Sequence, residues 1–551
     1  MKRLFLLFLL LALLTACKAP APAETTAPTD SSTTESTTEP TTEPTTETTT
    51  APTETQAVHF EVNADFSQYT EQAPVQAKYT RLTDDPLEDL QPLDTPTRIY
   101  PFPGKHLVHP GGGRYYAEDQ FRYGIVDETG CILADPVYSS VSLLMDQVSG
   151  KRLPYWLLNK GFPSTEDREA YDCYALASTD GTFVSDCIYS NITAYEGRIF
   201  AFYHNESEDR LSFDVYNTDL KLLLSSRNLP FADRLGGYSY DYTYAEGLYT
   251  IVFEERIYAP EGYYTREFSY YFMDDFGNLV LGPYEQAHMF CDGKAAVKLE
   301  DGYVFVDQNG SVITPKYEST HRLSTGNIIV CRETETDYIY ELLSSDLELL
   351  TTLPGYSIEQ GDGSILIFED GDVCSCYSSD GKELWRRSGW NYLSAEIVYN
   401  RSSEPPVVEN IPTGKTVSLP EDSHCALLGD PEDPIICISD YIYDCNYPVD
   451  YGSKYLDKEL NRLPLSESLY LRVSYCEVGL PYRSAIAILD TDKVTVYTDA
   501  HTAVGSYGVR DCHMADILPD QVVSLTTAEY TYLYHPNGEL ILAYPINPMD
   551  D

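Results

Sequence analysis

The sequence predicts an all-β protein built as a repeat array of β-hairpins. Beyond residue 58, short runs of β-branched and aromatic residues alternate with turn-forming residues at fairly even intervals, and helical periodicity is nearly absent. The chain has 551 residues, 43% of them hydrophobic, so it can bury a sizeable core. We expect a β-propeller-like arrangement of one or two rings, and an open β-solenoid is the alternative.

The first 17 residues have the pattern of an export signal. Lys2 and Arg3 form a positive start, and the apolar run 4–14 is too short to span a bilayer. The following Leu14-Thr15-Ala16-Cys17 resembles the lipobox of bacterial lipoproteins, in which the cysteine thiol receives a diacylglyceryl group. The resemblance implies that Cys17 carries acyl chains such as palmitate, and several chains give durable membrane attachment. An ordinary secretory signal, with Cys17 incidental, is the alternative.

Residues 18–57 differ in composition from the rest of the chain. They include sixteen Thr and six Pro and almost no bulky apolar side chain. Such a segment cannot bury enough surface to offset the entropy of ordering it. As a flexible coil it spans about 35 Å. We interpret it as a disordered tether between the membrane anchor and the folded body.

The repeat is clearest at residues 303–317, which read as a strand, a turn, a second strand, and then Pro and Tyr. Asp307 can accept hydrogen bonds from turn amides, Gly310 supplies the positive φ of a tight hairpin, and Tyr317 caps the second strand with a large ring. Three further units share this pattern. Their turn positions are Asp127 with Gly130, Asp274 with Gly277, and Gly181.

These units resemble the WG repeats of a family of bacterial proteins. In that family an aromatic residue and Gly precede two hydrophobic residues and Asp, followed by Gly, Pro and Tyr. Tyr123-Gly124-Ile125-Val126-Asp127 with Gly130 is the best match, although Tyr replaces the family's Trp. The resemblance implies a bacterial lipoprotein with WG-like repeats.

Weaker turn markers extend the repeat through the rest of the chain. They are Leu220, Leu347, Gly381, Gly414, Lys458, Lys493 and Gly538. With them the chain has eleven units that begin between residues 130 and 538, on average about 41 residues apart. Because one ring usually holds about four to eight blades, we expect two rings or one ring with long insertions.

The body therefore divides into three segments. Residues 58–116 lack the repeat and are expected to form a loop-rich cap or a strand that closes the array. Residues 117–400 form the WG-like repeat region, and residues 401–551 form a degenerate repeat region.

The net charge of −49 excludes some partners. With 37 basic and 86 acidic residues, the surface repels phosphates, which argues against nucleic-acid binding. It also repels anionic lipids, so membrane attachment must come from something other than a basic patch.

One stretch of aromatic residues is a candidate binding surface. Tyr238, Tyr240, Tyr242 and Tyr244 alternate with smaller polar residues. On a strand these four rings would share one face over about 20 Å. Aligned rings can stack on sugar rings or on peptide side chains. The alternative is core packing, since 47 tyrosines make such runs common.

The sequence carries no linear catalytic or metal-binding motif. It lacks H-E-x-x-H, G-x-S-x-G, a Walker loop and a complete EF-hand loop, so we assign no catalytic residue, metal ligand or cofactor. Its thirteen cysteines are spread through apolar runs and are expected to be buried thiols, with one or more disulfides as the alternative.

Together these features predict a lipid-anchored protein on the extracytoplasmic face of a cell membrane. The leading hypothesis is non-catalytic binding of a polymer, such as a glycan, or of a protein partner at the cell surface. A structural or assembly component of the envelope is the first alternative, and it predicts a large exposed apolar patch. An extracytoplasmic glycan hydrolase is the second, and it predicts two carboxylates in a cleft.

Overall fold

The computed structural model describes most of the chain beyond residue 76. The described residues are 77–81, 87, 89–107, 121–161, 172–205, 210–258, 264–334, 337–359, 363–369, 373–400, 403–419, 423–428, 434–439, 454–463, 470–473, 486–490, 493–497, 503–509 and 512–549. The predicted lipobox with Cys17, the predicted tether 18–57 and much of the segment 58–116 lie outside them.

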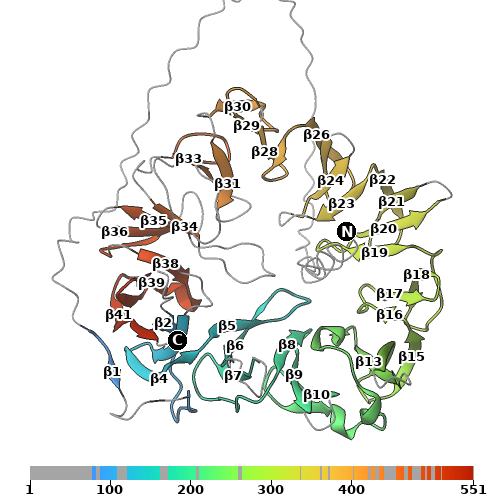
Figure 1. Ribbon diagram of the computed structural model, residues 1–551, viewed down its shortest axis with the longest axis horizontal. Coiled ribbons are helices and arrows are strands. Elements are labelled where there is room, and N and C mark those ends of the chain that lie inside the picture. Colours follow the sequence, from blue (N-terminus) through green and yellow to red (C-terminus); the bar gives the residue numbers. More distant parts are fainter. Residues whose placement is uncertain are drawn as a thin grey trace, which may run out of the picture. The chain divides into compact units, whose positions relative to one another are not determined.

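The described residues form an all-β protein of small, mainly antiparallel sheets that follow one another along the chain (Figure 1). Eleven sheets are described, with three to five strands each, and we number them in chain order. Neighbouring strands within a sheet are mostly consecutive in sequence, which is the meander of a propeller blade. The predicted fold class is therefore confirmed.

The first four sheets span residues 80–284 and the last strand of the chain. Sheet 1 contains β1 (Thr80–Arg81), β2 (Ile99–Leu107), β3 (Phe121–Asp127), β4 (Cys131–Tyr138) and β42 (Asn547–Met549). Sheet 2 contains β5 (Ser140–Met145), β6 (Arg152–Asn159) and β7 (Tyr174–Ser178). Sheet 3 contains β8 (Asn191–Tyr195), β9 (Arg198–Asn205), β10 (Arg210–Asn217) and β11 (Leu222–Ser225). Sheet 4 contains β12 (Thr243–Ala245), β13 (Leu248–Tyr258), β14 (Tyr264–Asp274) and β15 (Leu279–Tyr284).

The next four sheets span residues 286–418. Sheet 5 contains β16 (Gln286–Ala287), β17 (Lys294–Leu299) and β18 (Gly302–Asp307). Sheet 6 contains β19 (Ser319–Arg322), β20 (Ile328–Glu333), β21 (Tyr338–Leu343) and β22 (Leu349–Leu353). Sheet 7 contains β23 (Tyr356–Glu359), β24 (Ile365–Glu369), β25 (Val373–Tyr377) and β26 (Glu383–Ser388). Sheet 8 contains β27 (Asn391–Tyr392), β28 (Ile397–Asn400), β29 (Val407–Asn410) and β30 (Lys415–Ser418).

The last three sheets span residues 424–545. Sheet 9 contains β31 (His424–Leu428), β32 (Ile435–Ser439) and β33 (Lys454–Leu456). Sheet 10 contains β34 (Tyr470–Val473), β35 (Ile486–Asp490), β36 (Lys493–Tyr497) and β37 (Ala503–Tyr507). Sheet 11 contains β38 (Cys512–Ile517), β39 (Val523–Thr527), β40 (Tyr530–Tyr534) and β41 (Leu540–Pro545). The helical segments described are short 3-10 turns, namely η3 (Ser226–Asn228), η4 (Ala232–Arg234), η5 (Ser239–Asp241) and η6 (Pro519–Gln521).

Each sheet buries its apolar faces against its neighbours. Sheets 3 and 4, for example, share a cluster that includes Phe200, Phe213, Tyr242 and Tyr249, all at most 1% exposed. Similar clusters join most consecutive sheets along the chain. Because a single sheet leaves both faces exposed, the stability of each repeat depends on the repeats beside it.

The two ends of the described chain meet in sheet 1. Strand β42 pairs in parallel with β2, so that Lys105 lies opposite Asn547. A hydrophobic cluster of sheet 1 and sheet 11 includes Phe102 and Leu542. This pairing joins the first and last sheets of the described chain, as is typical of propellers.

A common turn precedes the last strand of the repeat unit. In the turn after β18, the Asp307 carboxylate accepts hydrogen bonds from the backbone N–H groups of Asn309 (2.9 Å) and Ser311 (2.8 Å), and Gly310 has a φ of +79°. Glycine adopts such a φ without steric cost. The other predicted turn positions lie in turns of the same kind, and they are Asp127, Gly130, Gly181, Asp274 and Gly277.

Ten of the eleven turn markers lie in the last hairpin of a different sheet among those described. Leucine takes the left-handed position in two of these turns, with φ values of +58° at Leu220 and +68° at Leu347. In the turn that contains Lys458, the left-handed residue is Leu460. Lys493 is a wrong marker, because it begins β36, the third strand of sheet 10, and so follows the preceding hairpin turn.

Candidate functional site

The tyrosine stretch lies in the connection between sheets 3 and 4, and it is not a single strand. Only its end belongs to β12, whereas residues 239–241 form η5. Tyr238 and Tyr240 are 51% and 53% exposed, but Tyr242 and Tyr244 are buried, at 0% and 6%. The prediction that four rings share one face is therefore wrong, because the 3-10 turn directs two rings to the surface and leaves two in the core.

Two glycines allow this connection to pass close to β13. Gly237 has a φ of +77°, and a Cβ atom on Gly236 would lie 2.2 Å from Cβ of Glu254. The Gly236 N–H donates to the Val252 carbonyl (3.1 Å), and the buried Tyr242 hydroxyl donates to the Gly236 carbonyl (2.7 Å). The backbone beneath the exposed rings is thus fixed to the core of sheet 4.

Asp241 holds the exposed pair in place. Its carboxylate accepts hydrogen bonds from the Tyr238 N–H (2.8 Å) and from the Tyr270 hydroxyl on β14 (2.9 Å). Burial raises the pKa of Asp241, and burial together with the Asp241 charge raises the pKa of Tyr270. The Tyr270 phenol is therefore protonated at neutral pH and serves as a hydrogen-bond donor to Asp241.

The two exposed rings form one surface. Tyr238 and Tyr240 are stacked, with centroids 5.1 Å apart and ring planes inclined by 10°. The ring of Phe268 on β14 lies 6.5 Å from that of Tyr238. Exposed, parallel rings whose backbone is fixed can bind a ligand with little loss of conformational entropy.

Charged side chains continue this surface along the β13–β14 hairpin. Glu254, only 7% exposed, forms ion pairs with Arg256 (Oε1–Nε 2.6 Å) and Arg266 (Oε1–Nε 3.6 Å). Glu254 is paired with Phe268 across the two strands, and Arg256 with Arg266, so their side chains share one face. We call Tyr238, Tyr240, Phe268, Arg256 and Arg266 the tyrosine–arginine platform.

The platform combines aromatic and charged side chains. Its two guanidinium groups share the carboxylate of Glu254, and the carboxylate of Asp241 accepts the Tyr238 N–H. Tyrosine and arginine are also the residue types that contribute most binding energy at interfaces. The sequence analysis missed the arginines. The alternation of Glu254 with Arg256 and of Tyr264, Arg266 and Phe268 is the period-two signal that could have indicated them.

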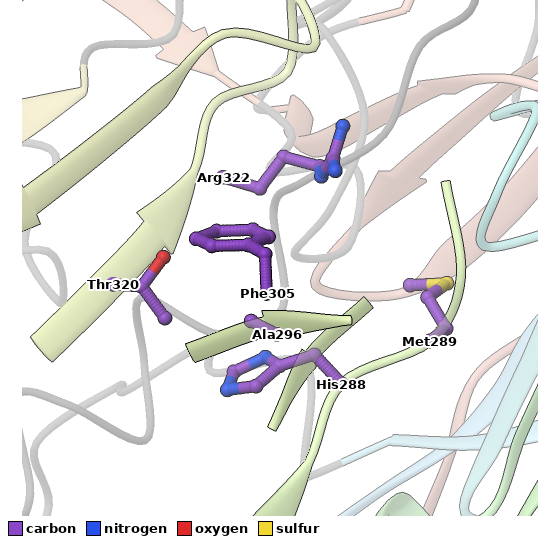
Figure 2. A pocket seen from close by; sticks show the side chains of 6 residues that line it. All are labelled: His288, Met289, Ala296, Phe305, Thr320 and Arg322. Carbon is purple, nitrogen blue, oxygen red and sulfur yellow. The ribbon is translucent and has the colours of Figure 1, made fainter. Parts of the chain in front are cut away.

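A small cavity lies between sheets 5 and 6 (Figure 2). It is lined by His288, Met289, Ala296, Phe305, Thr320 and Arg322. Its volume of about 30 Å³ holds one or two water molecules and not a sugar ring. Burial, with the nearby charges of His321 and Arg322, lowers the pKa of His288 to about 4, so this imidazole is neutral at pH 7.

Two kinds of feature are absent from the described residues. None of their His, Cys, Asp and Glu side chains form a group of three or more that could hold a metal ion. No helix in the described part of the chain is long and apolar enough to cross a membrane.

Comparisons with known proteins give similarities of fold only. No family model and no curated protein sequence matches the chain. Among solved structures, a eukaryotic initiation factor has 10% identity and a TM-score of 0.33, covering 68% of this chain and 93% of its own. Apo AztD from Citrobacter koseri has 12% identity and a TM-score of 0.24, covering 58% and 94%. BamB from Moraxella catarrhalis has 10% identity and a TM-score of 0.20, covering 56% and 97%. None of these similarities indicates a function for this chain.

Proposed function

We propose that this chain is a non-catalytic binding protein, held to the extracytoplasmic face of a bacterial membrane by lipid on Cys17, and that its partner docks on the tyrosine–arginine platform. The exposed, parallel pair of Tyr238 and Tyr240 is the observation that carries the proposal. A lipobox and a tether long enough to separate the body from the membrane support the location. The WG-like repeats would form the rigid support of the platform.

The composition of the platform favours a partner that presents rings or planar groups. Phenol faces stack on sugar rings or on peptide side chains, and guanidinium groups donate paired hydrogen bonds to carboxylates or carbonyl oxygens. A glycan and a protein segment both offer these groups. The array experiment below distinguishes them.

The test is a binding array with glycans, cell-wall fragments and extracytoplasmic proteins, probed with the body from residue 58 onward alongside the full chain. Tyr238→Ala/Tyr240→Ala should reduce binding at least tenfold, since two anchoring rings at about 1–2 kcal/mol each are removed. Tyr338→Ala is the matched control, because Tyr338 is 50% exposed but lies on sheet 6. Equal binding by the double variant and the wild type would contradict the proposal.

A role as an assembly component is the second candidate, and a repeated apolar surface favours it. The residues just after the repeat turn are exposed and apolar in six consecutive sheets, sheets 2 to 7. They are Phe183, Leu222, Leu223, Leu279, Val280, Val312, Ile313, Leu349, Leu350 and Leu384, all 36–57% exposed. Exposed apolar residues along outer strands are typical of surfaces that contact other proteins.

Cross-linking in intact cells distinguishes the two candidates. If assembly is the main role, Val312→Lys/Ile313→Lys should abolish a cross-linked complex that Tyr238→Ala/Tyr240→Ala leaves intact. If the platform is the main site, the reverse pattern is expected.

A further inference from the structure

Two cysteines of sheet 2 face each other across a short excursion of the chain. Cys173 directly precedes β7, and Cys187 lies in the segment that returns beside β7 through the bridges Tyr174–Tyr189 and Ala177–Val184. The Cys173 thiol donates to the Cys187 carbonyl (Sγ–O 2.6 Å), and the Cys187 thiol donates to the Cys173 carbonyl (Sγ–O 3.0 Å). Each thiol therefore lies in contact with the backbone of the other cysteine.

Burial raises the pKa of Cys187 to about 12, and a hydrogen bond with the Cys173 thiol is the next largest cause. A thiolate is therefore scarce at Cys187 in the folded state. Since thiolates are the attacking species in disulfide exchange, a bond at this position would form before the sheet is complete and would be protected afterwards.

We propose that Cys173 and Cys187 form a disulfide. The bond would form by thiol–disulfide exchange outside the cytoplasm. The oxidant is the disulfide of a small molecule or of an oxidoreductase. The thiolate of one cysteine attacks the oxidant, one oxidant thiol leaves, and the second cysteine attacks the mixed disulfide and displaces the other oxidant thiol. Two protein thiols are oxidised, one oxidant disulfide is reduced to two thiols, and the protons of the protein thiols end on the products. The proposed extracytoplasmic location supplies the oxidant.

The loop that this bond closes supports β2, the strand that pairs with the last strand of the described chain. It contains the turn around Gly181, whose carbonyl accepts the Leu93 N–H (2.9 Å). The carbonyls of Asp180 and Thr179 accept the N–H groups of Thr97 and Ile99, each at 3.1 Å. These residues lead into β2, which pairs with β42. A covalent constraint on the turn therefore stabilises the attachment of β2.

A second pair of neighbouring cysteines lacks the geometry for a disulfide. Cys425 and Cys437 lie on the neighbouring strands β31 and β32, but Cys425 is paired with Ile438 and Cys437 with Ala426. This offset of one residue places the two side chains on opposite faces of the sheet. They provide an internal comparison for the experiment.

The test is alkylation and mass spectrometry of the full chain isolated from aerobic cells that export it. Trypsin cuts after Arg168 and Arg198, so both cysteines fall in peptide 169–198. We expect this peptide to resist alkylation until reduction, to be lighter than the reduced peptide by two hydrogen atoms, and to accept two alkyl groups afterwards. Two alkyl groups before reduction would overturn the proposal.

Further readouts separate this result from the proposed location and function. Incorporation of labelled palmitate, with Cys17→Ser as its control, reports the lipid anchor independently of the disulfide. Dithiothreitol should lower the thermal midpoint of the wild type but not that of Cys173→Ser/Cys187→Ser. Cys425→Ser should keep the response of the wild type. Equal responses of the wild type and the double serine variant would overturn the proposal, whatever partner the platform binds.

Discussion

The hydroxyl of Tyr242 should be the main polar link between the platform and the core. Tyr242 is fully buried, and its ring packs on those of Phe213 (4.9 Å) and Phe202 (5.7 Å). Tyr242→Phe keeps these ring contacts and removes only the hydroxyl, which donates to the Gly236 carbonyl at 2.7 Å. The substitution therefore isolates one hydrogen bond.

The expected cost follows from what the lost hydroxyl leaves behind. The Gly236 carbonyl loses this donor in a buried place, which costs about 1–3 kcal/mol. The Val252 carbonyl, at 3.2 Å from the hydroxyl, keeps the Gly236 N–H as a donor and adds little. We therefore expect Tyr242→Phe to lower the free energy of unfolding by about 2 kcal/mol.

Urea denaturation of the full chain measures this change, with the denaturant dependence checked for an unchanged slope. Tyr338→Phe is the control, because Tyr338 is 50% exposed, and the effect of this substitution should stay within about 0.5 kcal/mol. If Tyr242→Phe is as stable as this control, the buried hydroxyl does not fix the connection beneath the platform, and the argument for a rigid platform fails.

Three further predictions test the turns, His288 and the anchor. Gly310→Ala should destabilise the protein more than Gly414→Ala. Both glycines have a positive φ (+79° and +65°), but only the Cβ added at residue 310 would clash, because it would lie 2.7 Å from Cδ2 of Leu281. Equal losses of stability in the two variants would contradict this prediction. Lowering the pH from 6.5 toward 4 should destabilise the wild type more than His288→Gln. The reason is that the imidazole of the unfolded state binds a proton in this range, whereas the folded imidazole, with its pKa of about 4, does not. Parallel pH profiles of the free energy of unfolding would refute this prediction. Cys17→Ser should move the protein from the membrane pellet to the soluble fraction, and continued sedimentation would disprove the lipid anchor.

Local conformation explains why the turns could be predicted from the sequence. A carboxylate that accepts the amides two and four residues later, as Asp307 does, and a glycine with a positive φ act within five residues. Such a unit is recognisable wherever it occurs, and even Leu220 and Leu347 adopt the left-handed conformation in the same place. These local signals are absent at Lys493, which is why the predicted turn marker is wrong there. Without them the ends of the strands depend on packing.

The platform shows what the sequence alone did not determine. The alternation of Tyr238, Tyr240, Tyr242 and Tyr244 is compatible with a strand, and nothing local separates exposed rings from buried ones. The tertiary structure decides which rings are exposed. Gly236 lies against β13, and Asp241 accepts the hydroxyl of Tyr270, which belongs to β14. The sequence by itself determined an all-β repeat and the place of its turns, since these depend on neighbouring residues. Which rings and charges share a surface was decided by contacts between residues far apart in the chain.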